Sequence, residues 1–203
     1  MSPATTQRAT VQTSSGRYID LLDPKPADIL IEDIAHALSN IARFNGHTHQ
    51  FYSVAQHCVL CSGINPDKLA LEKLLHDATE AYVGDMVTPI KNLFPGYRTM
   101  EDKIAGVIAQ AFGLNQGFHH DPEVKRSDLI MLLVEKHALL QANPEDQIEW
   151  ARIYQDFERL GFDRQLPLDQ IGCEPLIPWQ PVQAKQAFLD RFGQLYSASW
   201  CKK

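Results

Sequence analysis

The sequence lacks several features that would assign it to a special class of protein. None of its apolar runs is long enough to cross a bilayer, so we do not expect a membrane protein. The first eighteen residues, MSPATTQRATVQTSSGRY, contain no apolar signal-peptide core, which leads us to expect a cytoplasmic protein. Internal repeats and low-complexity tracts are also absent. With 44% hydrophobic and 22% charged residues in 203, the composition is typical of one ordinary globular domain.

Cysteines are few and form no evident framework. Cys58 and Cys61 have the spacing of a CxxC motif, which can indicate a redox or zinc site. The other two, Cys173 and Cys201, do not form a second pair that would complete a structural zinc site. The residues around CVLC are apolar and fit a helix, so we predict that Cys58 and Cys61 are buried free thiols.

The sequence also has no excess of basic residues. Its formal net charge of −6 argues against a protein that coats a nucleic-acid polymer. A nucleotide substrate remains compatible with this charge, because a bound divalent cation and a few Lys or Arg residues can offset it locally.

Hydrophobic periodicity predicts an all-α protein after an extended N-terminal segment. We expect residues 1–29 to be extended with a short strand at 17–22, residues 30–142 to form a helical core, and residues 143–203 to add helices packed on it. The predicted helices span 31–43, 53–63, 65–84, 97–112, 121–142, 145–160 and 181–196, and the least defined region is the loop 163–180.

Several of these boundaries depend on local capping signals. Ser53 and Gln56 have the spacing of a capping box, and Asn65 before Pro66 is typical of another helix start. Asp121 before a proline starts the helix at 121, so the pair His119-His120 is expected to be a loop preceding that cap.

The clearest chemical pattern is LLHDATEAYVGD. His76, Asp77 and Glu80 can project toward roughly one side of a helix that is otherwise apolar. Burying a carboxylate there is costly unless it is paired or coordinated. A His-Asp dipeptide alone is weak evidence, but its apolar setting calls for a partner.

Two more polar residues have a similar setting. His57 opens an apolar helix, and Asp128 lies on a stripe with Val124, Met131, Leu132, Glu135 and Leu139. Two imidazoles and two carboxylates suit Mn²⁺, Co²⁺, Fe²⁺, Ni²⁺ or Zn²⁺, with Mg²⁺ less natural for imidazole. From the residues alone a simpler interpretation stays open, in which His57 is a hydrogen-bonded helix histidine and Asp128 an early-turn acid.

The spaced motifs SVAQH, LLHDATEAYVGDMVTPIK and VKRSD resemble the HD-domain metal-dependent phosphohydrolases, and among them the small 5′-deoxynucleotidase-like group that includes phage-type members. The resemblance covers roughly residues 30–142, and GRYIDLLDPKPADI also resembles phage-type members. It implies a single-domain HD-domain helical bundle. The metal ligands that it implies are His57, His76, Asp77 and Asp128.

The resemblance also assigns acidic and basic roles. It implies Glu80 and Asp85 as catalytic acids and Arg43 and Lys91 as substrate-binding residues. Glu80 would orient or deprotonate the attacking water, or protonate the leaving oxygen. Asp85 would assist proton transfer or hold the loop, and a helix-end capping role is an equal alternative. A forked Arg and a Lys point charge suit phosphate oxygens.

The activity implied is hydrolysis of a nucleotide phosphate ester, with a (deoxy)nucleoside 5′-monophosphate as the expected substrate. Deoxynucleoside triphosphate triphosphohydrolase activity is the alternative, because the small phage-type members that the sequence resembles include such enzymes. The connection from His57 to His76 is also shorter than in bacterial deoxynucleotidases, so we expect the substrate-side loops to differ. A non-catalytic nucleotide-binding module and a purely structural helical protein are the other hypotheses. A homodimer is compatible with the resemblance.

Overall fold

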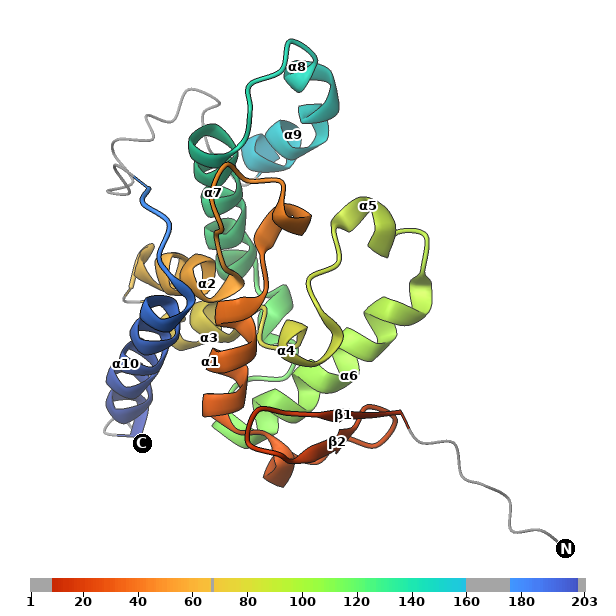
Figure 1. The fold of residues 1–203 in the computed structure, drawn as a ribbon, viewed down its shortest axis with the longest axis vertical. Helices are drawn as coiled ribbons and strands as arrows, with labels where there is room; N and C mark the ends of the chain where they lie inside the picture. Colours follow the sequence, from red (N-terminus) through yellow and green to blue (C-terminus); the bar gives the residue numbers. More distant parts are fainter. Residues whose placement is uncertain (1–8, 67, 160–175, 201–203) are drawn as a thin grey trace, which may run out of the picture.

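Helices make up most of the chain in the computed structural model, which describes residues 9–66, 68–159 and 176–200 (Figure 1). The prediction of an all-α single domain is confirmed, with one two-stranded sheet among the described residues. In chain order the elements are β1 (Thr10–Gln12), β2 (Tyr18–Asp20), the 3-10 helix η1 (Pro26–Asp28), α1 (Ile31–Asn40), the 3-10 helix η2 (Arg43–Gly46), α2 (Val54–Gly63), α3 (Ala70–Leu75), α4 (Glu80–Val83), α5 (Thr88–Lys91), α6 (Pro95–Phe112), the 3-10 helix η3 (Phe118–His120), α7 (Pro122–Leu139), α8 (Asp146–Glu149), α9 (Ala151–Arg159) and α10 (Pro181–Trp200).

The N-terminal segment forms a β-hairpin. Strand β2 lies within the predicted strand 17–22 and pairs antiparallel with β1, with Thr10 opposite Asp20. The partner strand β1 was not predicted. The hairpin turn is held on α1 by the carboxylate of Asp33, which accepts hydrogen bonds from both hydroxyls of Ser14 and Ser15 and from the Ser15 N–H at 2.7–2.8 Å.

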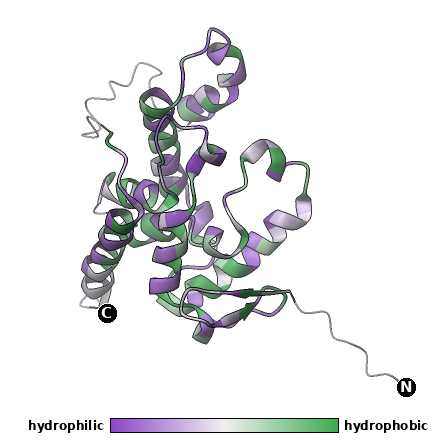
Figure 2. Cartoon of the chain, in the orientation of Figure 1, coloured by the Kyte–Doolittle hydropathy of each residue, from purple (hydrophilic) through white to green (hydrophobic). Residues whose placement is uncertain are grey.

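The main core lies among α1, α2, α3 and α10. Helix α10 packs on the other three and contributes Ala184 and Phe188, which are fully buried beside Leu38 and Leu74. Residues that are far apart in the sequence therefore share one core. Figure 2 shows hydrophobic and hydrophilic residues alternating along α10, as expected of a helix with one buried face.

The predicted helix 65–84 is wrong as a single element. Asn65 and Leu69 both have left-handed backbone angles, with φ of 45° and 53°, so α3 begins only at Ala70. The buried ammonium of Lys73 donates to the carbonyl of Ile64 at 2.7 Å, which stabilises this loop. A turn at 76–79 then separates α3 from α4.

Other predicted boundaries shift by smaller amounts. The helix predicted at 31–43 ends at Asn40, because Ile41 is extended and Ala42 forms a β-bridge with Ser53. The helix predicted at 145–160 is divided into α8 and α9, that predicted at 121–142 ends at Leu139, and α10 continues past 196 to Trp200. The predicted loop 163–180 lies mostly outside the described residues.

Two predicted ends agree closely with the structure. Helix α6 stops before Gly113, whose φ of 69° is the left-handed conformation that favours glycine at a helix C-terminus. Helix α7 is capped by Asp121, whose carboxylate accepts a hydrogen bond from the Glu123 N–H at 2.8 Å. Among the described residues, no helix combines the length and apolarity needed to span a membrane.

Candidate metal centre

His57 lies in the first turn of α2 and is fully buried. The Ser53 hydroxyl caps this helix by accepting from the Gln56 N–H at 3.2 Å, as predicted. The ring of His57 is oriented by Glu135, whose Oε1 lies 2.6 Å from Nδ1. This contact leaves Nε2 facing the centre of the site.

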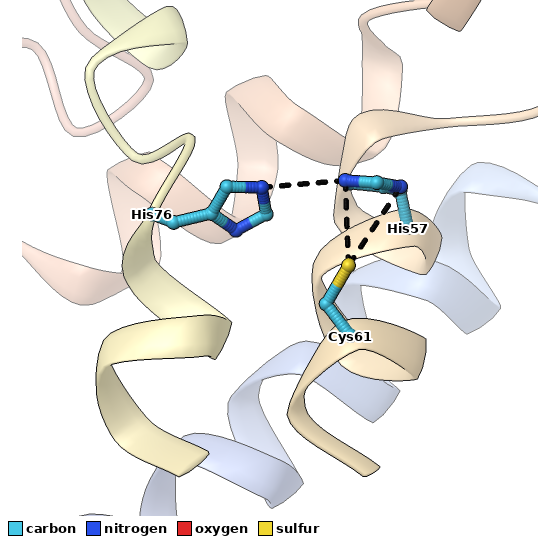
Figure 3. Close-up of side chains that lie close together, drawn as sticks. All are labelled: His57, Cys61 and His76. Atoms are coloured by element: carbon cyan, nitrogen blue, oxygen red, sulfur yellow. Dashed lines mark hydrogen bonds between the residues drawn. The ribbon is translucent and has the colours of Figure 1, made fainter. Parts of the chain in front are cut away.

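His76 is the C-cap residue of α3, and its ring faces that of His57 (Figure 3). Its Nδ1 lies 2.7 Å from the carbonyl oxygen of Lys73, which fixes the ring and leaves Nε2 free of backbone partners. The two Nε2 atoms are 3.3 Å apart. Figure 3 shows the rings of His57 and His76 directed toward one another from neighbouring helical segments.

Two carboxylates complete the arrangement. Asp77 Oδ2 lies 3.1 Å from His76 Nε2 and 3.6 Å from His57 Nε2. Asp128 Oδ1, on α7, lies 3.3 Å from His57 Nε2 and 3.8 Å from His76 Nε2. The side chains of Asp77 and Asp128 are 19% and 30% exposed, so the open side of the site is lined by carboxylates and its floor by imidazoles.

The spacing of the two imidazoles from each other and from the two carboxylates fits one cation. Ligands at right angles around an ion with bonds of about 2.1 Å lie about 3.0 Å apart, and tetrahedral ligands about 3.4 Å apart. The distances given above, 3.1–3.8 Å, fall close to these values. The structure thus brings together all four side chains that the sequence predicted as metal ligands.

The imidazoles and carboxylates of the site shift one another's pKa values in opposite directions. Burial acts to lower the pKa of His76, but Asp77 and Asp128 raise it well above its ordinary value. Burial acts to raise the pKa of Asp77 and Asp128, and the neighbouring imidazoles nevertheless hold both well below their usual range. The two carboxylates thus favour positive charge at the imidazoles, and the imidazoles favour the charged carboxylates.

The two cysteines of α2 border the same site. Cys58 and Cys61 are buried free thiols, as predicted. Cys61 Sγ lies 3.4 Å from His57 Nε2 (Figure 3). The thiol donates to the carbonyl of Ser127 at 3.7 Å. The donor atoms of His57, Cys61 and His76 form one group that can hold a metal, and those of Cys58, His76 and Asp77 form another. Cys173 and Cys201 lie outside the described residues.

Glu135 is a functional candidate that the sequence analysis missed. It is fully buried, and its carboxylate accepts from Tyr52 Oη at 2.8 Å and from Arg43 Nε at 3.0 Å besides contacting His57. A carboxylate behind a ligating histidine fixes the ring and raises its basicity. The signal was available, since Glu135 lies seven residues after Asp128, two helical turns along the same stripe.

Glu80 begins α4 and is buried, with only 4% of the residue exposed. Its Oε2 has no hydrogen-bond partner among the described residues. Burial, followed by the negative charges of Asp77 and Asp85, raises the pKa of Glu80 well above its ordinary value. Asp85 follows Gly84, is half-buried, and has a pKa raised by burial and by Asp77.

The two predicted substrate-binding cations lie at the edge of this group. Arg43 is buried in η2, where Nε donates to Glu135 and Nη1 lies 3.6 Å from Asp77 Oδ2. Lys91, at the end of α5, donates to Glu101 at 2.8 Å, and its Nζ lies 3.8 Å from Glu80 Oε1. Arg43 thus contacts Glu135 and the proposed ligand Asp77, and Lys91 contacts Glu80.

Comparison with known proteins identifies the family to which the chain belongs. No family model matches the sequence. The chain is 39% identical over 191 residues to the uncharacterized protein YfdR of Escherichia coli strain K12, an alignment that covers 94% of this chain and 98% of YfdR. It is 44% identical over 118 residues to the uncharacterized protein RCAP_rcc00048 of Rhodobacter capsulatus, covering 53% of this chain and 60% of that protein. The chain therefore belongs to the same family as YfdR.

Proposed function

We propose that this chain is a cytoplasmic metal-dependent phosphohydrolase of the HD-domain type that acts on a nucleotide phosphate ester. One observation carries the proposal: His57, His76, Asp77 and Asp128 converge from three parts of the chain beside the buried carboxyl group of Glu80. A purely structural bundle has no need for two imidazoles and three acids at one buried point, since each polar group there costs free energy to desolvate.

The donor set supports a first-row divalent cation. Two imidazole nitrogens and two carboxylate oxygens suit Mn²⁺, Co²⁺, Fe²⁺, Ni²⁺ or Zn²⁺, with Mg²⁺ less suited to imidazole. When bound, such an ion would polarise a phosphoryl oxygen and lower the pKa of a water molecule. The partly exposed carboxylates of Asp77 and Asp128 leave the approach from solvent open.

Glu80 is the proton-transfer group in this proposal. Its raised pKa keeps the carboxyl group protonated at higher pH than an ordinary glutamate, which suits a general acid for the leaving oxygen. The unpartnered Oε2 leaves one oxygen available to the substrate. Asp85 supports this role, because its negative charge helps to keep Glu80 protonated.

Arg43 and Lys91 provide positive charge for the phosphate. Lys91 Nζ is near Glu80 Oε1, so a phosphate held by Lys91 would lie within reach of that acid. The Nε of Arg43 is occupied by Glu135 and its Nη1 lies 3.6 Å from Asp77 Oδ2, so we assign the phosphate contact to Nη2. Together they offset the acids that would otherwise repel an anionic substrate.

The substrate that we propose is a (deoxy)nucleoside 5′-monophosphate. The test is hydrolysis of a panel of nucleoside mono- and triphosphates by the purified chain with Mn²⁺ or Co²⁺. We expect inorganic phosphate from monophosphates, with Glu80→Gln strongly impaired and Glu32→Gln, a change on the exposed face of α1, unaffected.

Two other outcomes of this assay would favour the alternative hypotheses. Tripolyphosphate from deoxynucleoside triphosphates would replace the monophosphate assignment with the triphosphohydrolase alternative. Metal-loaded protein that binds nucleotides but hydrolyses none of them would contradict the enzyme proposal and favour a regulatory binding module.

A further inference from the structure

A second cluster of metal-binding side chains lies away from the centre described above. Asp102 projects from the second turn of α6, and His119 and His120 come from η3, the short 3-10 helix before α7. None of these residues belongs to the elements that supply His57, His76, Asp77 or Asp128. The donor atoms of the three residues lie within 4.8 Å of one another.

Both histidines direct the same ring nitrogen at one oxygen. His119 Nε2 lies 3.0 Å and His120 Nε2 2.9 Å from Oδ1 of Asp102. Ligands at right angles around an ion with bonds of about 2.1 Å are about 3.0 Å apart, so each imidazole nitrogen lies at the distance from the Asp102 oxygen that two adjacent ligands of one ion would have. The ring centroids of the two histidines are only 3.9 Å apart.

The surroundings orient the cluster and leave it accessible. The ring of His119 packs edge-on against Phe118, with its side chain 13% exposed, and its buried Nδ1 has no hydrogen-bond partner among the described residues. The ring of His119 is thus oriented by its packing against Phe118 and by the contact of Nε2 with Asp102. Asp102 and His120 are 56% and 62% exposed, so water can occupy the remaining coordination positions.

We propose that Asp102, His119 and His120 form a second divalent-metal site, selective for Zn²⁺, Ni²⁺, Co²⁺ or Cu²⁺. Two imidazoles and one carboxylate favour these borderline ions over Mg²⁺ and Ca²⁺, which prefer oxygen ligands alone. An ion held there joins α6 to the segment that leads into α7. Because binding favours the folded state, the ion also stabilises the fold.

The test is Zn²⁺ titration of the full metal-free chain by calorimetry, with metal analysis after dialysis. We expect two bound equivalents in the wild type and the loss of one in His120→Ala and in Asp102→Asn. At saturating Zn²⁺ the wild type should also gain roughly 5 °C in Tm over either variant. His137→Ala, at an exposed position on α7, is the matched control and should retain both equivalents.

The outcomes separate this site from the centre at His57. Equal numbers of bound Zn²⁺ with equal affinities in the wild type, His120→Ala and Asp102→Asn would overturn the second site. One equivalent in the wild type and none in both variants would support it while contradicting the centre at His57. Stronger binding of Mg²⁺ than of Zn²⁺ at the equivalent lost in the variants would overturn the proposed selectivity.

Discussion

Two buried glutamates near the centre have opposite electrostatic surroundings. Burial acts to raise the pKa of Glu135, but Arg43, His57 and Tyr52 outweigh it and lower that pKa. Glu80 faces Asp77 and Asp85, so burial and like charge act together to raise its pKa. The surroundings thus favour the charged form of Glu135 and the protonated form of Glu80, and in the proposed mechanism Glu80 is the group that transfers a proton.

The role of Glu80 predicts a loss of rate without a loss of metal. Glu80→Gln keeps the shape of the side chain but removes the proton, so kcat should fall by about 10²–10⁴-fold. Metal analysis should give the same content in both proteins, because Glu80 is not a ligand in this account. A variant with wild-type kcat would contradict the proton-transfer role.

The raised pKa of Glu80 also predicts how the rate of hydrolysis depends on pH. A general acid is active while protonated, so the rate should fall as pH rises through the pKa of Glu80, at higher pH than for an ordinary glutamate. This alkaline decline should be absent from the residual activity of Glu80→Gln. A pH–rate profile with the same decline in both proteins would assign it to another group.

The anchoring role of Glu135 predicts a change in affinity. Glu135→Gln removes the charge behind His57, and metal affinity should fall by about 10–100-fold. Tyr52→Phe removes only one hydrogen bond to the same carboxylate, so its effect should be smaller. Calorimetric titration of Mn²⁺ or Co²⁺ measures both, and an unchanged affinity in Glu135→Gln would show that His57 needs no such support.

At the scale of the helices, local signals were predictable and tertiary ones were not. The caps Ser53 and Asp121 could be identified because each forms a hydrogen bond within three residues. The late start of α3 at Ala70 could not, because the loop before it is held by the buried Lys73, whose partners include Glu123 on another helix at 3.3 Å. Asn65 before Pro66 has the pattern of a cap, but the chain forms a left-handed turn there instead.

The side-chain contacts of Gln56 also could not be predicted from local spacing. The capping box predicts that its side chain returns to Ser53, but its amide instead donates to the Ile177 carbonyl at 2.8 Å and accepts from the Trp179 N–H at 2.7 Å. These hydrogen bonds hold the segment of Ile177 and Trp179, which precedes α10, against the residue next to His57. Only the spatial proximity of residues more than 120 positions apart creates them.

These hydrogen bonds of Gln56 predict a measurable cost. Gln56→Ala leaves the backbone groups of Ile177 and Trp179 without partners, so the free energy of unfolding should fall by about 1–3 kcal/mol. Gln186→Ala, on the outer part of α10, should change it by less than about 0.5 kcal/mol. Urea unfolding followed by circular dichroism compares them, and equal midpoints would refute the fastening role.

The attachment of the hairpin to α1 should depend on pH. Burial acts to raise the pKa of Asp33, but the hydrogen bonds from Ser14 and Ser15 lower it overall. The stabilisation is therefore present above the unfolded pKa of about 3.9 and is lost as pH falls through the lower folded value.

Asp33→Asn is the corresponding variant. It should lower the free energy of unfolding by about 1–2 kcal/mol at neutral pH, and by less below about pH 3.5. Glu32→Gln, in the same helical turn but exposed, serves as control. A difference between Asp33→Asn and the wild type that stays constant from neutral pH to pH 3 would contradict the assignment.

At the scale of the molecule, the four predicted ligands come together because α2, the α3–α4 turn and α7 meet beside the main core. Residue types and helical spacing indicated which side chains are costly to bury, and the family resemblance assigned them to one site. Spacing alone could not show that Glu135 supports His57 or that Cys61 borders it, since both contacts depend on how the helices pack.

The most direct test of the account is the anomalous diffraction of a crystal of the full chain soaked with Mn²⁺ or Co²⁺. The account predicts a peak bonded to Nε2 of His57 and of His76 and to one carboxylate oxygen each of Asp77 and Asp128. The absence of a peak there at saturating metal, or a peak held by Cys61 without the two carboxylates, would contradict the proposed centre.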